Sequence, residues 1–357
     1  MKPTVYQILP TMAYGDAVSN DALAIAEILH EMGYKNQIYA INIDQRLSGI
    51  VKPYSYFLAD KKDDIIIFHM STGSELSQSI IRLPNKNKIM FYHNITPENY
   101  FLNYSSVAYE LSKTGRAQLK LLNNTFKLSL ADSEYNRLEL EELGYKNTDI
   151  LPIILNFDDY KAMPDMNIIN KYNDEYINII FIGRIAPNKK QEDIIKTFYV
   201  YNRYINPRSR LFLIGSYRGM ERYYGHLKNL INELNLGNVI IPGHITFKEI
   251  ISYYKIGSVF LSMSEHEGFC VPLLESMIFE VPIIAYESSA IADTLGKSGI
   301  IFTIKKYELV AELINIVVSD MNLKNRIIQA QIQRLRDFER DRIKIKFRDI
   351  FEKNINK

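Results

Sequence analysis

One stretch of the chain decides how its surroundings can fold: Ser264-Glu265-His266-Glu267-Gly268-Phe269-Cys270-Val271-Pro272-Leu273-Leu274-Glu275-Ser276-Met277. It follows the apolar run Val259–Ser262, which is typical of a buried parallel strand. Gly268 permits a tight turn, and Pro272 suits the first position of a helix, where its missing N–H is not needed. The stretch therefore predicts a strand, a loop and a helix whose free N–H groups suit an anion such as pyrophosphate.

Two more strand ends carry candidate functional side chains. Arg184 and Lys189 follow the strand Ile179–Gly183, and a guanidinium fork with an ammonium group suits a diphosphate. His93 closes the strand Ile89–His93, with Asn94 and Thr96 beside it. For Arg184 and Lys189 the alternative is a loop at a helix start that happens to be basic. For His93 it is a structural histidine at a strand end.

Polar loops after two further strands complete a rim of candidate residues. Gly15 and Asp16 follow the first strand, and Ser71-Thr72-Gly73 follows the third. In open α/β sheets ligands bind beyond the carboxyl ends of the strands, and all five segments occupy such positions. Glu267 and Glu275 have simpler alternatives: a solvated loop carboxylate, and a first-turn carboxylate favoured by the helix dipole.

Short apolar runs alternate with helix-like stretches along the whole chain, which indicates doubly wound α/β sheets. Eleven such runs are more than one sheet usually needs, so we predict two domains. Residues 1–155 form the expected first domain, 156–175 a polar linker and 176–335 the second domain. Residues 336–357 form a C-terminal helix that we expect to cross back to the first domain.

The expected strands are Val5–Leu9, Gln37–Ile41, Asp64–His69, Ile89–His93, Leu128–Asp132, Ile179–Gly183, Leu211–Gly215, Val239–Ile241, Val259–Ser262, Pro282–Tyr286 and Gly299–Phe302. The expected helices include Ser19–Met32, Ser105–Asn123, Gln191–Tyr204 and Glu221–Leu234.

Composition narrows the class of protein. The 357 residues suit roughly two domains at ~150 residues each. The net charge of +2 gives no global basic field, so we expect no nucleic-acid partner. Cys270 is the single cysteine, which excludes an intrachain disulfide and fits a reducing compartment. No signal peptide or spanning segment is evident, so we expect a cytoplasmic protein.

The last 36 residues, Asn322–Lys357, hold eleven Lys or Arg and five Asp or Glu, a local balance of +6. Two interpretations stay open at this stage. The stretch is either a solvated helix face with ion pairs or a surface that contacts anionic lipid at the inner face of a membrane.

The combined motifs resemble family 4 of the retaining glycosyltransferases, which have the GT-B fold. The resemblance rests on Glu-x-Glu-Gly-Phe-x-x-Pro-x-x-Glu-Ser-Met at 265–277, on Val281–Ala285 after it, and on Gly183-Arg184-x-x-Pro187-x-Lys189. It implies two Rossmann-like domains facing a central cleft, and a sugar transfer from a nucleotide-sugar. The N-terminal half matches more loosely, through Gly15, His93-Asn94 and Leu151–Phe157.

The resemblance also implies roles for individual residues. Arg184 and Lys189 would bind the donor diphosphate, Glu275 the ribose, and the backbone near Ile245 the base. Glu267 and His93 would be the catalytic residues that hold the donor sugar. The remaining donor-binding candidates are Gly15, Gly268, Phe269, Cys270 and Val271, and the acceptor-side candidates are Asp16, Asn94 and Thr96.

Two departures from the family pattern stand out: Cys270 replaces a glycine, and Tyr14-Gly15-Asp16 replaces a Gly-Gly loop. No Asp-x-Asp triplet occurs, so we expect no essential metal and no cofactor. The resemblance points to bacterial surface-polysaccharide assembly, with a UDP- or GDP-hexose donor and a glycan or lipid-linked glycan acceptor.

Two other functions compete with this one. A nicotinamide-dependent oxidoreductase would need Gly-x-Gly-x-x-Gly after a strand, and the sequence has no such string. A non-catalytic relative that binds a nucleotide-sugar or glycan is the other alternative. The presence of Arg184, Lys189, Glu267 and Glu275 argues against a decayed site.

Overall fold

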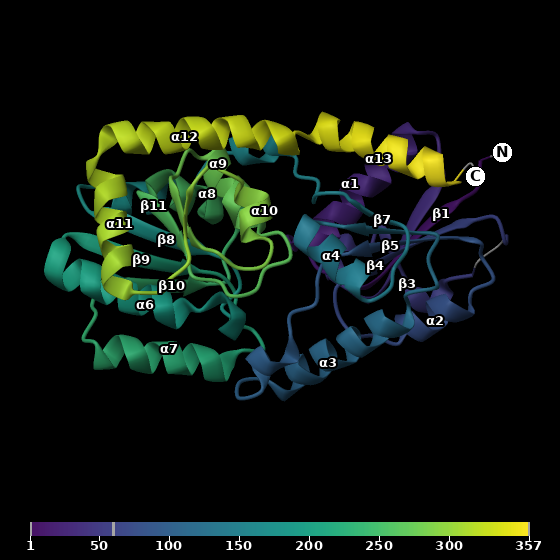
Figure 1. The fold of residues 1–357 in the computed structure, drawn as a ribbon, viewed down its shortest axis with the longest axis horizontal. Helices are drawn as coiled ribbons and strands as arrows, with labels where there is room; N and C mark the ends of the chain where they lie inside the picture. The colour runs from purple at the N-terminus through teal and green to yellow at the C-terminus, as the bar shows by residue number, and fades with distance from the viewer. Residues whose placement is uncertain (1, 59–60, 356–357) are drawn as a thin grey trace. The chain divides into compact units, whose positions relative to one another are not determined.

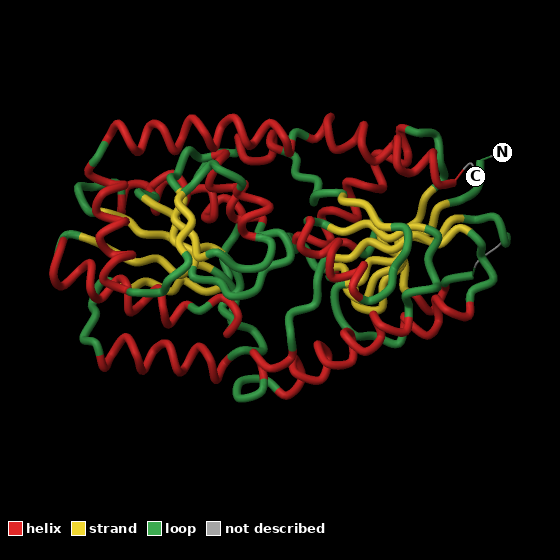
Figure 2. Tube along the Cα trace, in the orientation of Figure 1, coloured by secondary structure: helices red, strands yellow, loops and turns green. Residues whose placement is uncertain are grey.

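The structure, a computed structural model, describes residues 2–58 and 61–355. The chain divides into two compact units, each built around a parallel sheet with helices on both faces (Figures 1 and 2). Unit 1 comprises Met1–Glu98, Tyr109–Asn156 and Phe338–Lys357, and unit 2 comprises Asn99–Ala108 and Phe157–Asp337.

The sheet of unit 1 has seven strands in the order β3-β2-β1-β4-β5-β6-β7, all paired in parallel. The strands are β1 (Val5–Met12), β2 (Asn36–Ile43), β3 (Val51–Pro53), β4 (Ile65–Met70), β5 (Asn87–Tyr92), β6 (Leu128–Ala131) and β7 (Thr148–Ile150). The α-helices are α1 (Ala17–Glu31), α2 (Leu76–Arg82), α3 (Ser106–Leu121), α4 (Glu134–Glu142) and α13 (Arg340–Ile355). Short 3₁₀ helices lie at Gln45–Leu47, Tyr54–Tyr56 and Glu98–Phe101.

The sheet of unit 2 has six parallel strands in the order β10-β9-β8-β11-β12-β13. The strands are β8 (Ile177–Ile182), β9 (Ser209–Ile214), β10 (Val239–Gly243), β11 (Val259–Ser262), β12 (Ile283–Tyr286) and β13 (Ile300–Phe302). The α-helices are α5 (Met166–Tyr172), α6 (Gln191–Val200), α7 (Glu221–Glu233), α8 (Phe247–Ile256), α9 (Val271–Ile278), α10 (Ile291–Leu295), α11 (Tyr307–Ser319) and α12 (Met321–Leu335). Tyr201–Ile205 is a π-helix, and 3₁₀ helices lie at Phe157–Lys161, Pro187–Lys189 and Arg336–Phe338.

The central strands are apolar because helices cover both faces of each sheet. Every residue of β4 is buried, as are five of the six residues of β5 and of β8. This is the pattern expected of parallel sheets, whose crossover helices occupy both faces. The α/β class and the two doubly wound sheets are therefore confirmed, and the central cleft between domains stays a prediction.

All eleven predicted strands are present, and two strands were missed. The missed strands β3 and β7 are three residues long and form the two edges of one sheet. Only Val51 among their six residues is buried, so they lack the apolar run that marks a central strand.

The unit boundaries differ from the predicted domain boundaries in two places. Asn99–Ala108 belongs to unit 2 although it lies within the predicted first domain. Most of the predicted linker 156–175 also folds into unit 2, where Asp165 N donates to Ser252 Oγ at 2.7 Å. The polar composition that indicated a linker instead reflects exposed turns around α5, whose cap is Asp165.

Helix α13 of the basic C-terminal stretch lies beside α1 in unit 1 (Figure 1), and acidic residues of α1 partly neutralise its charge. Arg340 pairs with Glu27, and Glu31 pairs with Lys344 and with Arg348, the latter at 3.6 Å. These ion pairs favour the solvated face over the lipid-contacting one. Lys357, counted in the charge balance, lies outside the described residues. Among the described residues no helix is both long and apolar enough to cross a membrane.

A close contact between two glycines joins the loop after β4 to α3. A Cβ on Gly115 would lie 2.6 Å from Gly73 N, and one on Gly73 would lie 2.6 Å from Leu111 O. Both obstacles are backbone atoms, so α3 would have to shift to admit a side chain. Gly115→Ala is expected to destabilise unit 1 by about 2 kcal/mol or more, in the range of other overpacked cores.

The matched control is Gly225→Ala in α7, where an added Cβ meets no atom within 4 Å. That change is expected to stabilise the protein by about 0.5–1 kcal/mol through helix propensity. Thermal unfolding of both variants checks the pair, and equal stability of the two would contradict the close-contact argument.

Candidate functional site

The loop that connects β11 to α9 is held in place by hydrogen bonds from neighbouring loops. Asn188, after β8, anchors it from one side: its Nδ2 donates to His266 O at 3.0 Å, and Glu265 N donates to its backbone carbonyl at 2.8 Å. From the other side Ser289 Oγ, after β12, accepts from Glu267 N at 2.7 Å. These contacts fix the loop without a ligand, as a preorganised site requires.

Cys270 adopts the left-handed conformation that favours glycine. It lies directly before α9, with φ 70° and ψ 67°, and its side chain is buried. A residue with a Cβ loses roughly 1 kcal/mol or more in this conformation. This gives a physical reason why a glycine suits the position. Burial also raises the pKa of the Cys270 thiol, which keeps it uncharged.

Lys189 and Glu267 form an ion pair. Lys189 ends the 3₁₀ helix after β8, and Glu267 belongs to the loop after β11. The side chain of Glu267 is 7% exposed and that of Lys189 is 19% exposed, so water screens the pair only partly. Sequence reasoning placed both residues in the site, and the structure brings them into contact.

Arg184 lies at the open rim of the same edge. Its side chain is exposed, and its Nη2 donates to Arg218 O at 3.3 Å in the loop after β9. Arg184 and Lys189 thus both extend from the segment that follows β8. The pair can offer a bidentate fork and a point charge to an anion.

Glu275 lies deeper in α9 than predicted. The helix begins at Val271, one residue before Pro272, and its first turn has no acidic residue. The first-turn prediction for Glu275 is therefore wrong, because the αL residue Cys270 starts the helix earlier. Helix-dipole stabilisation does not explain this carboxylate.

Two phenols hold the buried Glu275 carboxylate. Tyr160 donates to its Oε1 at 2.9 Å, and Tyr254 donates to its Oε2 at 2.7 Å. Burial raises the pKa of Glu275, and the two hydroxyl donors oppose that rise. Each carboxylate oxygen keeps a second lone pair, so the group can still accept hydrogen bonds from a diol.

A second charged cluster supports the loop and was not predicted. Lys305 Nζ lies 2.8 Å from Glu265 Oε1 and 2.9 Å from Asp193 Oδ2. Tyr307 donates to Asp193 Oδ1 at 2.9 Å. Lys305 lies 112 positions from Asp193 and 40 from Glu265 in the sequence, so no local motif could have revealed these contacts. Ile245, predicted to meet a base, lies between β10 and α8 and is half-buried.

The polar candidates of unit 1 mostly have structural partners. Asp16 caps α1 and accepts from Ser19 N at 3.2 Å, while Gly15 turns the chain before it with φ 78°. Asn94 is buried and donates to Asn136 Oδ1 at 2.7 Å. Thr96 is half-buried in the following loop. The acceptor-side roles of these residues stay predictions.

His93 belongs to a buried chain of hydrogen bonds that runs across the sheet. Its Nδ1 lies 3.0 Å from Asp132 Oδ2, and its Nε2 lies 2.9 Å from His69 Nδ1. His69 Nε2 in turn lies 2.9 Å from Gln7 Oε1. Both ring nitrogens of His93 are thus engaged by protein groups, and its side chain is 1% exposed. The ring does not point a free nitrogen at a substrate in this structure.

Asp21 completes a compact group with the two histidines. Ligand atoms of Asp21, His69 and His93 lie within 4.8 Å of one another, which makes them a candidate cation site by distance alone. The 2.9 Å between the two imidazole nitrogens is a direct hydrogen bond. Two imidazoles on one tetrahedral Zn²⁺ lie farther apart, about 3.3 Å for bonds of about 2.0 Å. We therefore assign the group to hydrogen bonding.

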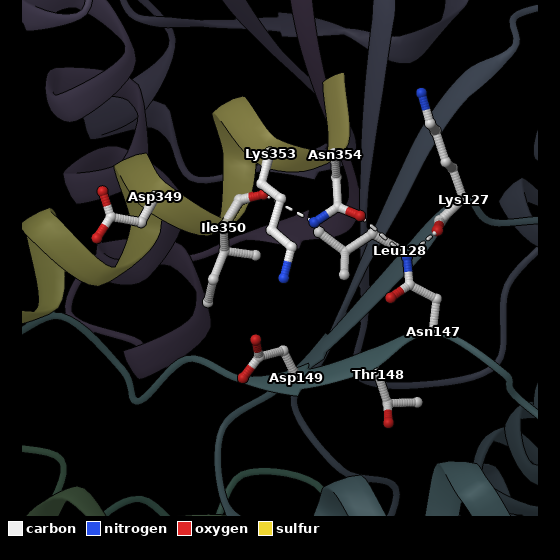
Figure 3. A pocket seen from close by; sticks show the side chains of 9 residues that line it. All are labelled: Lys127, Leu128, Asn147, Thr148, Asp149, Asp349, Ile350, Lys353 and Asn354. Carbon is white, nitrogen blue, oxygen red and sulfur yellow. Dashed lines mark hydrogen bonds between the residues drawn. The ribbon is translucent and has the colours of Figure 1, made fainter. Parts of the chain in front are cut away.

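A pocket of about 630 Å³ lies elsewhere in unit 1, between the β6–β7 edge and α13 (Figure 3). Its charged lining is mixed in sign, with Lys127 and Lys353 against Asp149 and Asp349. Figure 3 shows the Lys353 and Asp149 side chains extending toward the hollow. None of the catalytic, donor-binding or acceptor-side candidates predicted from the sequence lines this pocket.

Part of the chain matches a known protein family and a curated relative. Residues 164–334 match the profile of the family described as Glycosyl transferases group 1. An alpha-monoglucosyldiacylglycerol synthase of Acholeplasma laidlawii is 32% identical over 148 residues, which are 40% of this chain and 35% of that protein. The match thus spans about a third of that relative's length.

Solved structures resemble the whole chain. HepE of Anabaena in complex with UDP-glucose has a TM-score of 0.76 at 15% identity, with 98% of this chain and 99% of that chain covered. Sucrose-phosphate synthase from Thermosynechococcus elongatus has a TM-score of 0.75 at 14% identity, with 98% of each chain covered. At such identities the likeness concerns the fold, which is GT-B-like as predicted.

Substitutions of Cys270 test directly whether this residue, which precedes α9, has the left-handed backbone conformation. Cys270→Gly is expected to fold with stability within about 1 kcal/mol of the wild type, because relief of strain offsets the lost side chain. Cys270→Val is expected to lose about 2 kcal/mol or more, because a branched Cβ fits this conformation poorly. Calorimetric unfolding checks both, and equal stability of the variants would refute the assigned conformation.

The raised pKa of Asp21 predicts that the free energy of unfolding depends on pH. Burial raises its pKa to about 7, above the unfolded value of 3.8. The folded state therefore binds this proton more tightly, and the stability it contributes is lost as the pH rises through about 7. Asp21→Asn carries no charge, so it should unfold at a higher temperature than the wild type at pH 8.5, by roughly 3–6 °C for ~1–2 kcal/mol.

At pH 5 the advantage of Asp21→Asn should be clearly smaller, because the carboxyl of the folded wild type is then protonated. Calorimetry at both pH values decides, and an advantage of Asp21→Asn that is equal at pH 5 and pH 8.5 would count against the assignment.

Proposed function

We propose that this chain, whose residues 164–334 belong to the glycosyl transferases group 1 family, moves a sugar from a nucleotide-sugar to an acceptor with retention of configuration. The observation that carries the proposal is the contact between Lys189 and Glu267. These residues follow β8 and β11, neighbouring strands at which the order of the sheet reverses. Ligands of open α/β sheets bind at such a switch point.

The donor diphosphate is proposed to bind Arg184, Lys189 and the amides at the start of α9. Cleavage of the sugar C1–O bond leaves negative charge on the diphosphate, which these groups stabilise. Lys189 has three N–H donors, so it can hold a phosphate oxygen while it stays paired with Glu267. Glu275 would accept hydrogen bonds from the ribose, and Glu267 from hydroxyls of the transferred sugar.

The proposed transfer proceeds on one face of the sugar. The acceptor oxygen bonds to C1 as the diphosphate leaves, and the acceptor proton passes to a diphosphate oxygen. Neither Glu267 nor Glu275 then acts as a nucleophile. The engagement of Glu267 by Lys189 and of Glu275 by two tyrosines supports this assignment. No metal-dependent step is part of the proposal.

UDP-glucose is the donor to test first. HepE of Anabaena, similar in fold, has a structure in complex with UDP-glucose. The partly similar synthase of Acholeplasma laidlawii is named for a glucosyl lipid, which supports a lipid-linked or glycan acceptor. We further propose a place in bacterial surface-polysaccharide assembly, at the inner face of the membrane. Vesicle binding would then use exposed C-terminal cations such as Lys346 and Lys353.

The test begins with thermal shifts of the full chain in UDP, GDP and ADP and their sugars. A donor that binds the native state raises the unfolding temperature. Arg184→Ala and Glu275→Gln are then expected to reduce the shift and to lower kcat/KM by about a hundredfold and tenfold, respectively. Exposed Arg222 and Glu233 of α7 give the matched controls Arg222→Ala and Glu233→Gln.

The outcomes separate the two candidate functions. Transfer or slow donor hydrolysis that fails in the Arg184 and Glu275 variants supports the transferase. Donor binding with neither hydrolysis nor transfer, over a panel of glycan and lipid acceptors, supports the non-catalytic relative instead. Full activity of either variant would show that the site is assigned wrongly.

A further inference from the structure

Hydrogen bonds link Gln7, His69, His93 and Asp132 in a row, and the partner of each atom determines whether that atom carries a proton. Gln7 Nε2 donates to Ala22 O at 3.0 Å, so its amide oxygen is the atom that faces His69. An amide oxygen only accepts hydrogen bonds, and His69 Nε2 must therefore carry a proton. The orientation of one glutamine amide thus sets the tautomer of the first histidine.

His69 is neutral, which sets the next proton. It is fully buried on β4 and packs against Phe91, and burial lowers its pKa well below the usual value, with His93 acting in the same direction. A neutral imidazole with its proton on Nε2 has a lone pair on Nδ1. His93 Nε2, at 2.9 Å, must then donate to it.

The second ring nitrogen of His93 faces a carboxylate. Asp132 Oδ2 lies 3.0 Å from Nδ1. Burial raises the pKa of Asp132, and the charge and hydrogen bond of His93 oppose that rise. As a carboxylate, Asp132 accepts the Nδ1 proton, and both nitrogens of His93 then carry hydrogen. A ring protonated on both nitrogens is an imidazolium.

The groups that face His93 have compensating charges. They are Asp132 after β6, His69 on β4, Asp21 on α1 and Asp16 before α1. Burial by itself lowers the pKa of His93, but the charge and the hydrogen bond of Asp132 outweigh it, with further contributions from Asp16 and, when it is ionised, from Asp21, so that the pKa is raised. With Asp21 protonated, the cation of His93 and the anion of Asp132 leave the cluster neutral, the arrangement that a buried site favours.

We propose that His93 is a buried imidazolium fixed by His69 and Asp132, and that it serves the reaction by its charge and position without exchanging a proton. His69 and Asp132 are then positioning residues, which act on the sugar transfer through His93. This part of the inference rests on the proposed function. His93 cannot act as the base that takes the acceptor proton, because both of its nitrogens already carry one. That proton must pass to another group.

Nitrogen NMR of the full chain with labelled histidine tests the protonation directly and needs no activity. The chain has six histidines, and spectra of His69→Gln and His93→Gln assign the two signals. We expect His93 to show two protonated nitrogens from pH 6 to pH 8, and His69 to be neutral with its proton on Nε2. A neutral His93 at pH 7, or one that titrates between pH 6 and 8, would overturn the proposal.

Kinetics test the positioning role. Asp132→Asn keeps the shape but removes the anion, so His93 should lose its charge as the pH rises. The kcat of this variant should then fall by about tenfold or more between pH 6 and pH 9, beyond any change in the wild type. Asp132→Glu should restore part of the activity, while Asp149→Asn, on the neighbouring strand β7, should behave as the wild type does.

The NMR and kinetic measurements allow the protonation of His93 and the proposed function to fail separately. If no donor is turned over, the proposed function fails and the NMR measurement still decides the state of His93. If Asp132→Asn keeps the wild-type kcat at pH 9, the charge of His93 is not what the reaction uses, and the positioning role is refuted.

Discussion

The pairing of β8 with β11 is the constraint on which the candidate site depends. These strands are neighbours in the sheet although the residues that follow them lie 78 positions apart, as Lys189 and Glu267 do. Parallel pairing brings both carboxyl ends to one edge, and the reversal of strand order there opens space for a ligand. The basic segment after one strand and the acidic loop after the other therefore meet without any local sequence signal for the contact.

Unit 1 uses the same geometry to a different end. Adjacent pairing of β1, β4, β5 and β6 lines up Gln7, His69, His93 and Asp132 as a chain of hydrogen bonds. A buried polar group is tolerated only when it has partners, so each member of this chain depends on the next. The histidine that sequence reasoning assigned to a substrate contact is thus also part of the internal support of the sheet edge.

Much of the fold was predictable because central parallel strands are apolar on both faces. β4 and β8 show the reason, since almost no residue of either is accessible. The short edge strands β3 and β7 lack that pattern and were missed, and the segment Asn99–Ala108 was placed in the wrong unit. Glu275 was placed one residue too early in the helix, and hence in its first turn, because the left-handed conformation of Cys270, which starts α9 at Val271, cannot be read from residue type.

The sequence by itself determined the α/β class, eleven of the thirteen described strands and the motif residues Arg184, Lys189, Glu267 and Glu275. Composition and spacing suffice for these because they are local: an apolar run marks a strand, and glycine or proline marks the turn beside it. Only the tertiary structure decided that Lys189 pairs with Glu267, that Tyr160 and Tyr254 hold Glu275, and that His93 lies between His69 and Asp132. Each of these contacts joins residues distant in the chain, and burial then sets the charge that each group carries.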